Sequence, residues 1–432
     1  MLNNIRHKTY NLLRKSEKYT QTDMVYLAKG GFWLALAQVV VSGSSFLMAI
    51  AFANLLPKDI YGNYRYILSL IGILDIFTMS GINTALISAA ARQAEGEFWP
   101  SFIAKIKWSI LATIGSIGVA TYYYINHNYL LAGAFGASAV LLPFFRLAGL
   151  YISLLQGRKN FKLSTIYESS ARVAAVILMI LVIWLTDNIF LMILAYFLPE
   201  TILHFIFTLT TIKKQPLNKN RDNQTVSFGL HLSVMELIRN IAAQLDKILI
   251  FHGLGAINLA VYAFATAPAS QIKSVLMNIK VLALPKISEQ SDQNIRLHLA
   301  KKIKKLELLT LLIIIIFIPL APLFYKLFFP QYLDSVRYAQ VYILILLAVP
   351  RTLLSTAMVA KMKQAELYGI RIISPILRII ILLIAFKLWS LWGIVAGAVI
   401  SELAILILYQ IFYKRAFSLS GYTGPDGDGQ SK

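Results

Sequence analysis

The sequence contains no cysteine, so disulfide bonds, thiolate catalysis and cysteine-based metal sites are excluded. Charged residues fill only 14% of the 432 positions, and acids are the scarcer sign, because 20 Asp and Glu stand against 41 Lys and Arg. The six histidines show no metal-ligand spacing, and the chain has neither a phosphate-binding loop nor a dinucleotide glycine fingerprint. We therefore predict no metal, no cofactor, no direct use of ATP and no enzymatic activity.

Hydrophobic residues, by contrast, make up 58% of the sequence. A membrane-spanning helix needs about 20 mostly apolar residues, and such runs follow one another almost from end to end. Residues 311–318 are apolar at every position, whereas the strands of a membrane barrel would alternate polar and apolar residues. The sequence therefore predicts an all-α, polytopic membrane protein. Its net charge of +21 is then expected to meet membrane lipids, and nucleic acid is not an expected partner.

The apolar runs predict about twelve transmembrane helices separated by short polar gaps. We place them at 27–53, 64–90, 102–125, 129–156, 165–186, 188–212, 226–252, 256–285, 306–329, 335–361, 368–388 and 390–413. Alternate gaps then collect most Lys and Arg on one side, while Lys58, Lys326 and Lys387 fall on the other. By the positive-inside rule, both termini are cytoplasmic, and the chain is expected to be a multi-pass protein of the inner (cytoplasmic) membrane.

The two halves of the chain resemble each other, which predicts two six-helix lobes around a central cavity. Pro143 and Arg146 in the first half are echoed by Pro350 and Arg351 in the second. Residues 294–309 are expected to form a basic amphipathic helix on the membrane surface. The predicted organisation is a basic N-terminal segment at 1–26, an N-lobe at 27–212, a cytoplasmic linker at 213–225, a C-lobe at 226–413 and a cytoplasmic tail, expected to be disordered, at 414–432.

Charged residues inside the predicted spans are the candidate functional residues, because a basic group at mid-membrane costs about 2.5–3.5 kcal/mol and needs water or a partner. Bases near the middles of spans are Arg146, Arg172, Arg239, Lys273, Arg351 and Arg378, with Lys247 and Lys280 nearer the ends. Acids at depth are Asp75, Glu168, Glu200, Glu236, Asp246 and Glu402. Pairing each acid with one base leaves a positive surplus, which predicts a hydrated, cationic lumen that selects anions.

Structural roles remain open for some of these side chains. Glu168 and Arg172 stand four positions apart and could form an ion pair within one helix. A single stripe of one helix is expected to line the lumen and carries Glu236, Arg239, Asp246 and Lys247. Guanidinium groups suit phosphate, because they stay charged and donate two parallel hydrogen bonds.

Three arginines have no acid within four positions on their own helix, so their partners must come from another helix or from the substrate: Arg146, Arg351 and Arg378. Pro350 beside Arg351 leaves open a structural arginine at a helix break. The candidates for proton or cation coupling are Asp75, Glu200 and Asp246, with a helix-packing role as the alternative for each.

Several segments resemble the polysaccharide transporter family of oligosaccharide flippases, within the multidrug/oligosaccharidyl-lipid/polysaccharide (MATE-like) exporter superfamily. The matching segments are Asn54-Leu-Leu-Pro-Lys-Asp-Ile-Tyr-Gly-Asn-Tyr64, Gly81-Ile-Asn-Thr-Ala85 with Arg92, Gln156-Gly-Arg-Lys-Asn-Phe161, Asp246-Lys-Ile-Leu-Ile250 followed by Gly253-Leu-Gly255 and Val261-Tyr262, Pro285-Lys-Ile-Ser288 and Trp392-Gly-Ile-Val-Ala-Gly397. The resemblance covers most of the chain, and it rests on turn and packing motifs rather than on lumen residues.

This resemblance implies a flippase that moves undecaprenyl-pyrophosphate-linked oligosaccharide from the cytoplasmic to the outer leaflet by alternating access, for cell-surface polysaccharide biosynthesis. Expected partners are that lipid-linked oligosaccharide, membrane lipids, H+ or Na+ as a coupling ion, and a polysaccharide polymerase or ligase. The main alternative is a MATE-type multidrug or cation antiporter, which would need an acidic lumen. A membrane glycan polymerase or ligase is less favoured, because it normally carries a large outer loop that this sequence lacks.

Overall fold

The computed structural model describes residues 24–277, 287 and 292–418, and within these ranges it contains helices and short 3-10 turns but no strand. This confirms the predicted all-α fold. The chain forms two compact units: Met1–Ala260 with Phe328–Gln331 is unit 1, and Val261–Leu327 with Tyr332–Lys432 is unit 2. Most of the predicted N-terminal segment, Lys280, most of the Pro285–Ser288 motif and most of the C-terminal tail lie outside the described residues.

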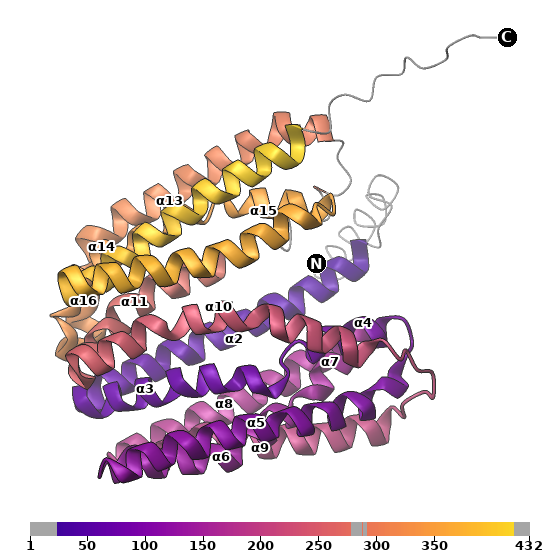
Figure 1. Cartoon of the computed structure of the whole chain (residues 1–432), viewed down its shortest axis with the longest axis horizontal. Helices are drawn as coiled ribbons and strands as arrows, with labels where there is room; N and C mark the ends of the chain where they lie inside the picture. Colours follow the sequence, from indigo (N-terminus) through magenta and orange to yellow (C-terminus); the bar gives the residue numbers. More distant parts are fainter. Residues whose placement is uncertain (1–23, 278–286, 288–291, 419–432) are drawn as a thin grey trace, which may run out of the picture. The chain divides into compact units, whose positions relative to one another are not determined.

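Unit 1 is built mainly from helices that lie side by side in Figure 1. In chain order they are α2 (Met24–Leu55), α3 (Lys58–Leu74), η1 (Asp75–Thr78), α4 (Ile82–Ala91), η2 (Glu95–Glu97), α5 (Phe98–Ile125), α6 (Tyr129–Ala148), α7 (Leu150–Gly157), α8 (Phe161–Leu185), α9 (Ile189–Lys214) and α10 (Thr225–Leu254). Helix α5 packs beside α6, α6 beside α9, and α8 beside both α9 and α2.

Asparagine begins three of these helices. The side chains of Asn128, Asn160 and Asn188 accept hydrogen bonds from the backbone N–H groups of Leu131, Leu163 and Phe190 at 3.1, 3.3 and 2.9 Å. Asparagine is favoured at this position because its side-chain oxygen satisfies an N–H group that has no acceptor within the helix. These caps fix where α6, α8 and α9 start after their short connections.

The second predicted span is broken in the structure. Segments Lys58–Thr78 and Ile82–Ala91 meet at an angle of 49°, with Met79 in the left-handed region at φ 57°. Gly81 follows the break, and a Cβ there would lie 2.5 Å from the carbonyl oxygen of Gly229. The Gly81 N–H also donates to Ser233 Oγ at 2.9 Å. Helix α10 therefore packs directly against the break. This close packing explains why the first position of the Gly81–Ala85 motif is a glycine, because a side chain there would clash with α10.

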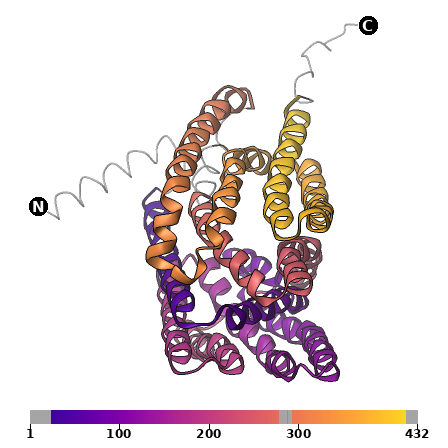
Figure 2. The same ribbon diagram turned by 90° about the vertical axis from the view of Figure 1, so that its left-hand side faces the viewer.

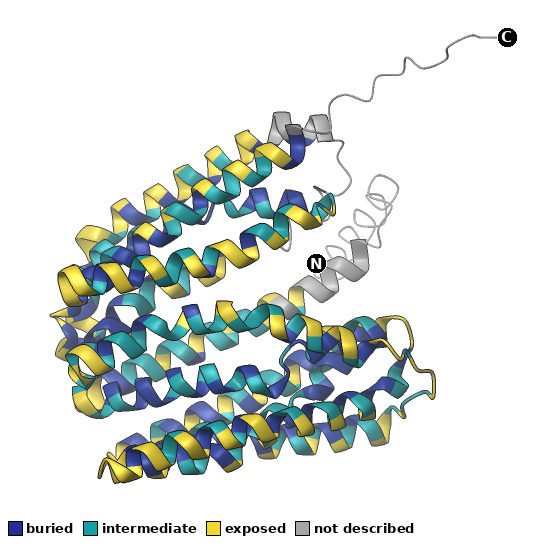
Figure 3. Ribbon diagram, viewed as in Figure 1, coloured by how far each residue is buried: buried dark blue, intermediate teal, exposed yellow. Residues whose placement is uncertain are grey.

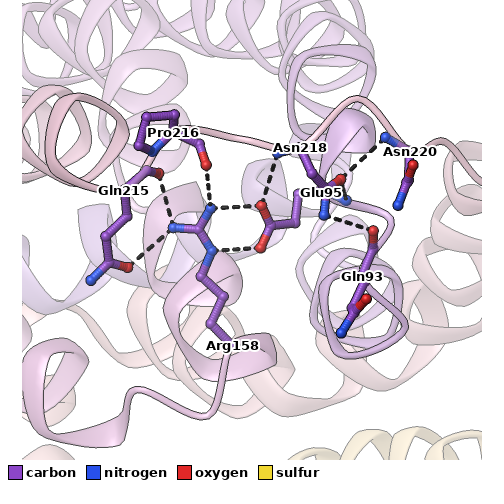
Figure 4. Close-up of polar contacts among 7 residues, drawn as sticks. All are labelled: Gln93, Glu95, Arg158, Gln215, Pro216, Asn218 and Asn220. Carbon is purple, nitrogen blue, oxygen red and sulfur yellow. Dashed lines mark hydrogen bonds and ion pairs between the residues drawn. The ribbon is translucent and has the colours of Figure 1, made fainter.

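Arg158 is one of several side chains that hold the predicted linker after α9 to the rest of unit 1, and Figure 4 shows its contacts. The guanidinium of Arg158 donates to both carboxylate oxygens of Glu95 at 2.6 and 2.7 Å, to the backbone and side-chain oxygens of Gln215 at 3.1 and 3.2 Å, and to the Pro216 carbonyl at 3.2 Å. Glu95 also accepts from the Asn218 N–H at 3.1 Å. All five guanidinium N–H groups thus have acceptors.

Unit 2 contains most of α11 (Ala256–Met277) and of α13 (Asp292–Phe328), together with α14 (Ser335–Tyr342), η4 (Ile343–Ala348), α15 (Thr352–Ala360) and α16 (Gln364–Ser418). The short turn η3 (Pro330–Tyr332) belongs to unit 1 except for its last residue. Helix α16 consists of two arms that meet at Trp389 and Ser390, where the backbone is not helical. The arms run side by side in Figure 2. They approach so closely that a Cβ at Gly393 would lie 1.8 Å from the Ala385 carbonyl oxygen.

The surfaces of both units suit a membrane. Figure 3 shows exposed residues in stripes along the helices, and on α5 such a stripe is formed by Ile106, Ile110, Ile114 and Ile117. Eight helices among the described residues are long and apolar enough to cross a bilayer, or nine with the broken span. The two arms of α16 count once there, and α10 and α11 are not included. The number twelve and the predicted lobe boundaries remain predictions.

Candidate functional site

Unit 1 encloses a polar cavity of about 480 Å³ between α2, α4, α6, α7, α8 and α9. Its charged and hydrogen-bonding lining residues are Asn83, Arg146, Ser153, Gln156, Glu168, Arg172, Glu200 and His204. These helices are otherwise strongly apolar, with mean hydropathies of 1.7 for Tyr129–Gly157 and 1.9 for both Phe161–Leu185 and Ile189–Lys214. The polar side chains are therefore concentrated toward one internal space, as expected for a hydrated site in a membrane protein.

The two predicted arginines of this cavity are both held by carboxylates from other elements. Arg146 Nε donates to Asp75 Oδ1 at 2.6 Å, and Arg172 Nη1 donates to Glu200 Oε1 at 3.2 Å. Thr78 Oγ1 donates a hydrogen bond to the same Asp75 oxygen at 2.9 Å. Asp75 lies in η1, at the broken span, so the break brings this carboxylate to Arg146. Two of the predicted coupling acids therefore join helices in the present structure.

Glu168 lines the cavity without an ion pair. The pair that the spacing of Glu168 and Arg172 allows within α8 does not form, because Arg172 reaches across to Glu200 on α9. Glu168 makes no hydrogen bond or ion pair with the part of the chain that the structure describes. It is thus the one acidic lining residue of the cavity whose charge is not held by a neighbouring base.

Lys105 is a buried base near this cavity that the sequence analysis did not select. Its side chain is 1% exposed, and Nζ donates to Asn83 Oδ1 at 2.9 Å. The only sequence signal was that Lys105, like Lys107, lies inside the predicted span 102–125. With Lys105 included, three bases and three acids surround this region, because Arg146, Arg172 and Lys105 stand against Asp75, Glu168 and Glu200. The formal charge of the region is therefore zero.

Several buried polar atoms around the cavity have no hydrogen-bond partner within the described residues. They include Nδ1 of His204, the hydroxyl of Tyr151 and Oγ1 of Thr201. His204 and Thr201 are both 8% exposed, and Tyr151 is fully buried. Buried polar atoms of folded proteins nearly always find a partner in protein, water or ligand. The cavity is therefore suited to hold water or a polar ligand group.

The predicted stripe on α10 does not form one uniform surface. Arg239 is 64% exposed at its side chain and pairs with Glu236 at 3.0 Å, one helical turn away. The Asp246 side chain is only 5% exposed, and its oxygen accepts from the Lys247 N–H at 2.8 Å. Lys247 Nζ in turn bonds to Ala243 O and Gln244 Oε1. Within unit 1, Arg239 is accessible and Asp246 is buried.

The remaining predicted bases lie in unit 2, and they too contact acids. Lys273 Nζ lies 2.7 Å from Glu402 Oε1, and Arg378 Nη1 lies 3.6 Å from the same oxygen. Two cations therefore contact the same carboxylate. Arg351 Nε donates to Glu307 Oε1 at 3.1 Å. Glu307 is not among the acids that the sequence analysis selected, although it lies at the start of the predicted span 306–329.

Each of the six predicted bases thus contacts a carboxylate. For Arg146 and Arg351 the acid comes from another element, and for Arg378 it comes from the other arm of α16, so none of the three partners lies within four positions. Around the unit 1 cavity three acids balance three bases, so the predicted positive surplus of a shared lumen stays a prediction. A direct role of these residues in holding substrate remains a prediction.

Comparisons with known proteins place the fold. A family model described as a polysaccharide biosynthesis protein matches residues 27–291. Among curated protein sequences, none matches this chain. Solved structures of similar fold include an inward-facing multidrug resistance MATE family transporter of the MOP superfamily, with a TM-score of 0.66, 13% identity and coverage of 90% of this chain and 96% of that chain.

The lipid II flippase MurJ in an inward closed conformation has a TM-score of 0.67 and 12% identity, with coverage of 92% of this chain and 94% of that chain. The eukaryotic MATE transporter AtDTX14 has a TM-score of 0.59 and 11% identity, with coverage of 91% and 98%. At such identities the likeness shows the fold alone. It confirms the MATE-like fold that the sequence motifs imply.

Proposed function

This chain belongs to the polysaccharide biosynthesis protein family, and we propose that it is a flippase that carries polyprenyl-pyrophosphate-linked oligosaccharide from the cytoplasmic to the outer leaflet of the cell membrane. The family and the transporter fold support a membrane protein that moves a lipid-linked substrate. The glycan, the direction of transport and the cytoplasmic location of both termini are parts of the proposal.

The observation that carries the proposal is the cluster formed by Lys273, Arg378 and Glu402. Two cations share one carboxylate there, although each basic group at mid-membrane costs about 2.5–3.5 kcal/mol. Both cations contact the same carboxylate oxygen, so they lie close enough together to bond to one anionic group at once. Such charge-assisted contacts suit a diphosphate.

Transport by alternating access would use these charges as follows. The diphosphate and glycan cross in hydrated polar space, while the polyprenyl tail stays in hydrocarbon and has no desolvation cost. The bases Arg146, Arg172, Arg239, Lys273, Arg351 and Arg378 replace part of the phosphate hydration. A coupling ion, H+ or Na+, would bind to carboxylates, and the predicted candidates are Asp75, Glu200 and Asp246. Glu168 is a further candidate, because it lines the cavity and forms no ion pair with the described residues.

The test is depletion of the protein in its host, followed by measurement of lipid-linked oligosaccharide on each face of the cytoplasmic membrane. We expect accumulation on the cytoplasmic face and its reversal by the wild-type gene. Arg378→Ala should fail to reverse it while the protein remains folded and inserted. Arg371→Ala is the matched control, because this arginine lies on the same arm of α16 and is exposed. No accumulation after depletion would refute the proposed function.

A second candidate function is a cation antiporter of the MATE type. The unpaired carboxylate of Glu168 in the unit 1 cavity favours it, because a cation can bind an acid that no base neutralises. Depletion would then raise sensitivity to cationic drugs without any change in lipid-linked oligosaccharide. Measurements of lipid-linked oligosaccharide and of drug sensitivity in the same depleted strain therefore distinguish the two candidate functions.

A further inference from the structure

A second cavity, of about 840 Å³, lies within unit 2 along one side of α13. One part of its lining is basic and comes from Lys301, Lys304, Lys305 and Arg351. The other part is apolar and comes from five leucines of α13, η4 and α16: Leu308, Leu311, Leu347, Leu403 and Leu406. We call this cavity the lysine–leucine groove. It is separate from the unit 1 cavity and from the Glu402 cluster.

The order of residues along α13 separates the two parts of the groove. Positions 301, 304, 305, 308 and 311 follow helical spacing, so they share one side of α13. The opposite side, with Ile295, Leu299 and Leu306, is buried against α15 and α16. Leu311 lies seven residues beyond Lys304, which corresponds to about 10 Å along the helix axis. The groove therefore changes from cationic to apolar over the length of a lipid headgroup and the start of its chain.

The charges of the groove are mostly uncompensated. Four bases stand against the single acid Glu307, so the formal charge is 4 − 1 = +3. The three lysines make no ion pair with the described residues, and all three are exposed. Arg351 is held by Glu307 through Nε. The apolar part is accessible too, because Leu308 is 69% and Leu311 44% exposed.

We propose that the lysine–leucine groove is a binding site for an isoprenoid diphosphate, with the diphosphate on Lys301, Lys304, Lys305 and Arg351 and the first isoprene units on the leucines. This inference rests on the proposed function, because it assigns the occupant to the lipid carrier of the substrate. A diphosphate diester carries two negative charges and a common phospholipid such as phosphatidylglycerol carries one, so the net charge of +3 favours the diphosphate.

The test uses the purified full chain in detergent and undecaprenyl diphosphate, with the bound fraction measured by native mass spectrometry. We expect Lys304→Gln and Lys305→Gln each to weaken binding about tenfold, because each removes a charge-assisted contact to phosphate. The matched control is Lys302→Gln, which changes the same charge on the same helix at an exposed residue that does not line the groove. It should bind as the wild type does.

Competition distinguishes the diphosphate lipid from other occupants. Undecaprenol and inorganic pyrophosphate should each compete poorly, because each lacks one half of the ligand. Equal competition by phosphatidylglycerol would show a general phospholipid site and overturn the proposal, and equal competition by inorganic pyrophosphate would show an anion site without lipid recognition and overturn it as well. An equal loss of binding in Lys302→Gln would also overturn it.

The outcome is separable from that of the proposed function. If depletion causes lipid-linked oligosaccharide to accumulate but the lysine variants bind normally, only the groove assignment fails. If the groove variants lose binding but depletion causes no accumulation, the flippase function fails and the binding site stands.

Discussion

Replacement of Arg158 tests how much this side chain contributes to holding the linker between α9 and α10. The Arg158 and Glu95 side chains are only 13% and 12% exposed, and two hydrogen bonds of 2.6 and 2.7 Å join them. Removing one partner of a buried ion pair costs about 3–5 kcal/mol. Residual exposure and the remaining Asn218 contact of Glu95 reduce this loss, so we expect about 2–4 kcal/mol for Arg158→Ala.

Arg158→Lys separates charge from geometry. A lysine ammonium keeps the positive charge but donates at most three hydrogen bonds, whereas the five guanidinium N–H groups all have acceptors here. At least two hydrogen bonds are lost, at about 0.5–1.5 kcal/mol each. We therefore expect the Arg158→Lys protein to be more stable than the Arg158→Ala protein but clearly less stable than the wild type.

The assay is thermal unfolding of the purified protein in detergent, combined with limited proteolysis of residues 215–224. Both variants should melt earlier, and the linker should be cleaved faster before global unfolding begins. Lys219→Ala is the control, because it removes one positive charge from the same linker at an exposed side chain. Unchanged melting and proteolysis in Arg158→Ala, or an equal change in Lys219→Ala, would show that Arg158 does not hold the linker.

Three further predictions concern other charged groups. Lys105→Met should leave the melting temperature equal or higher, because an apolar side chain of similar length replaces a buried ion, whereas Asn83→Ala should cost about 1–3 kcal/mol by removing the hydrogen-bond acceptor of Lys105. Glu168→Gln should preserve glycan export if the cargo is anionic, and loss of export with retained folding would favour cation coupling at this residue. The hydrogen bond from Arg92 lowers the pKa of Asp222. The stability that this contact contributes is therefore present above the unfolded pKa of about 3.9 and is lost as the pH falls through the lower folded pKa. Without the contact, in Arg92→Gln, proteolysis of the linker should begin at a higher pH than in the wild type.

Much of the fold could be predicted from the sequence, because the length of apolar runs determines where helices can cross a bilayer. The predicted boundary between spans 368–388 and 390–413 coincides with the change of direction at Trp389 and Ser390. The break between α3 and α4 could not be predicted, because residues 64–90 are continuously compatible with one helix. That break depends on the approach of α10 to Gly81, a contact between residues far apart in the sequence.

The candidate site was predictable in part for the same reason. Local spacing showed that Arg146 needed a partner from elsewhere, but it could not identify Asp75, which lies 71 positions away. Spacing also suggested a Glu168 to Arg172 pair, which Glu200 displaces. Lys105 was missed because Lys105 and Lys107, near the start of span 102–125, resemble lysines that extend toward the membrane surface. Only its burial and the contact with Asn83 identify it as an internal charge.

The balanced charges of unit 1 place a condition on any anion that enters its cavity. A diphosphate that bonded to Arg146 would displace Asp75, and the displaced carboxylate would then face the diphosphate in a medium of low dielectric constant, where like charges repel strongly. An anion at Arg146 is therefore opposed by Asp75 unless that carboxylate gains another cationic partner.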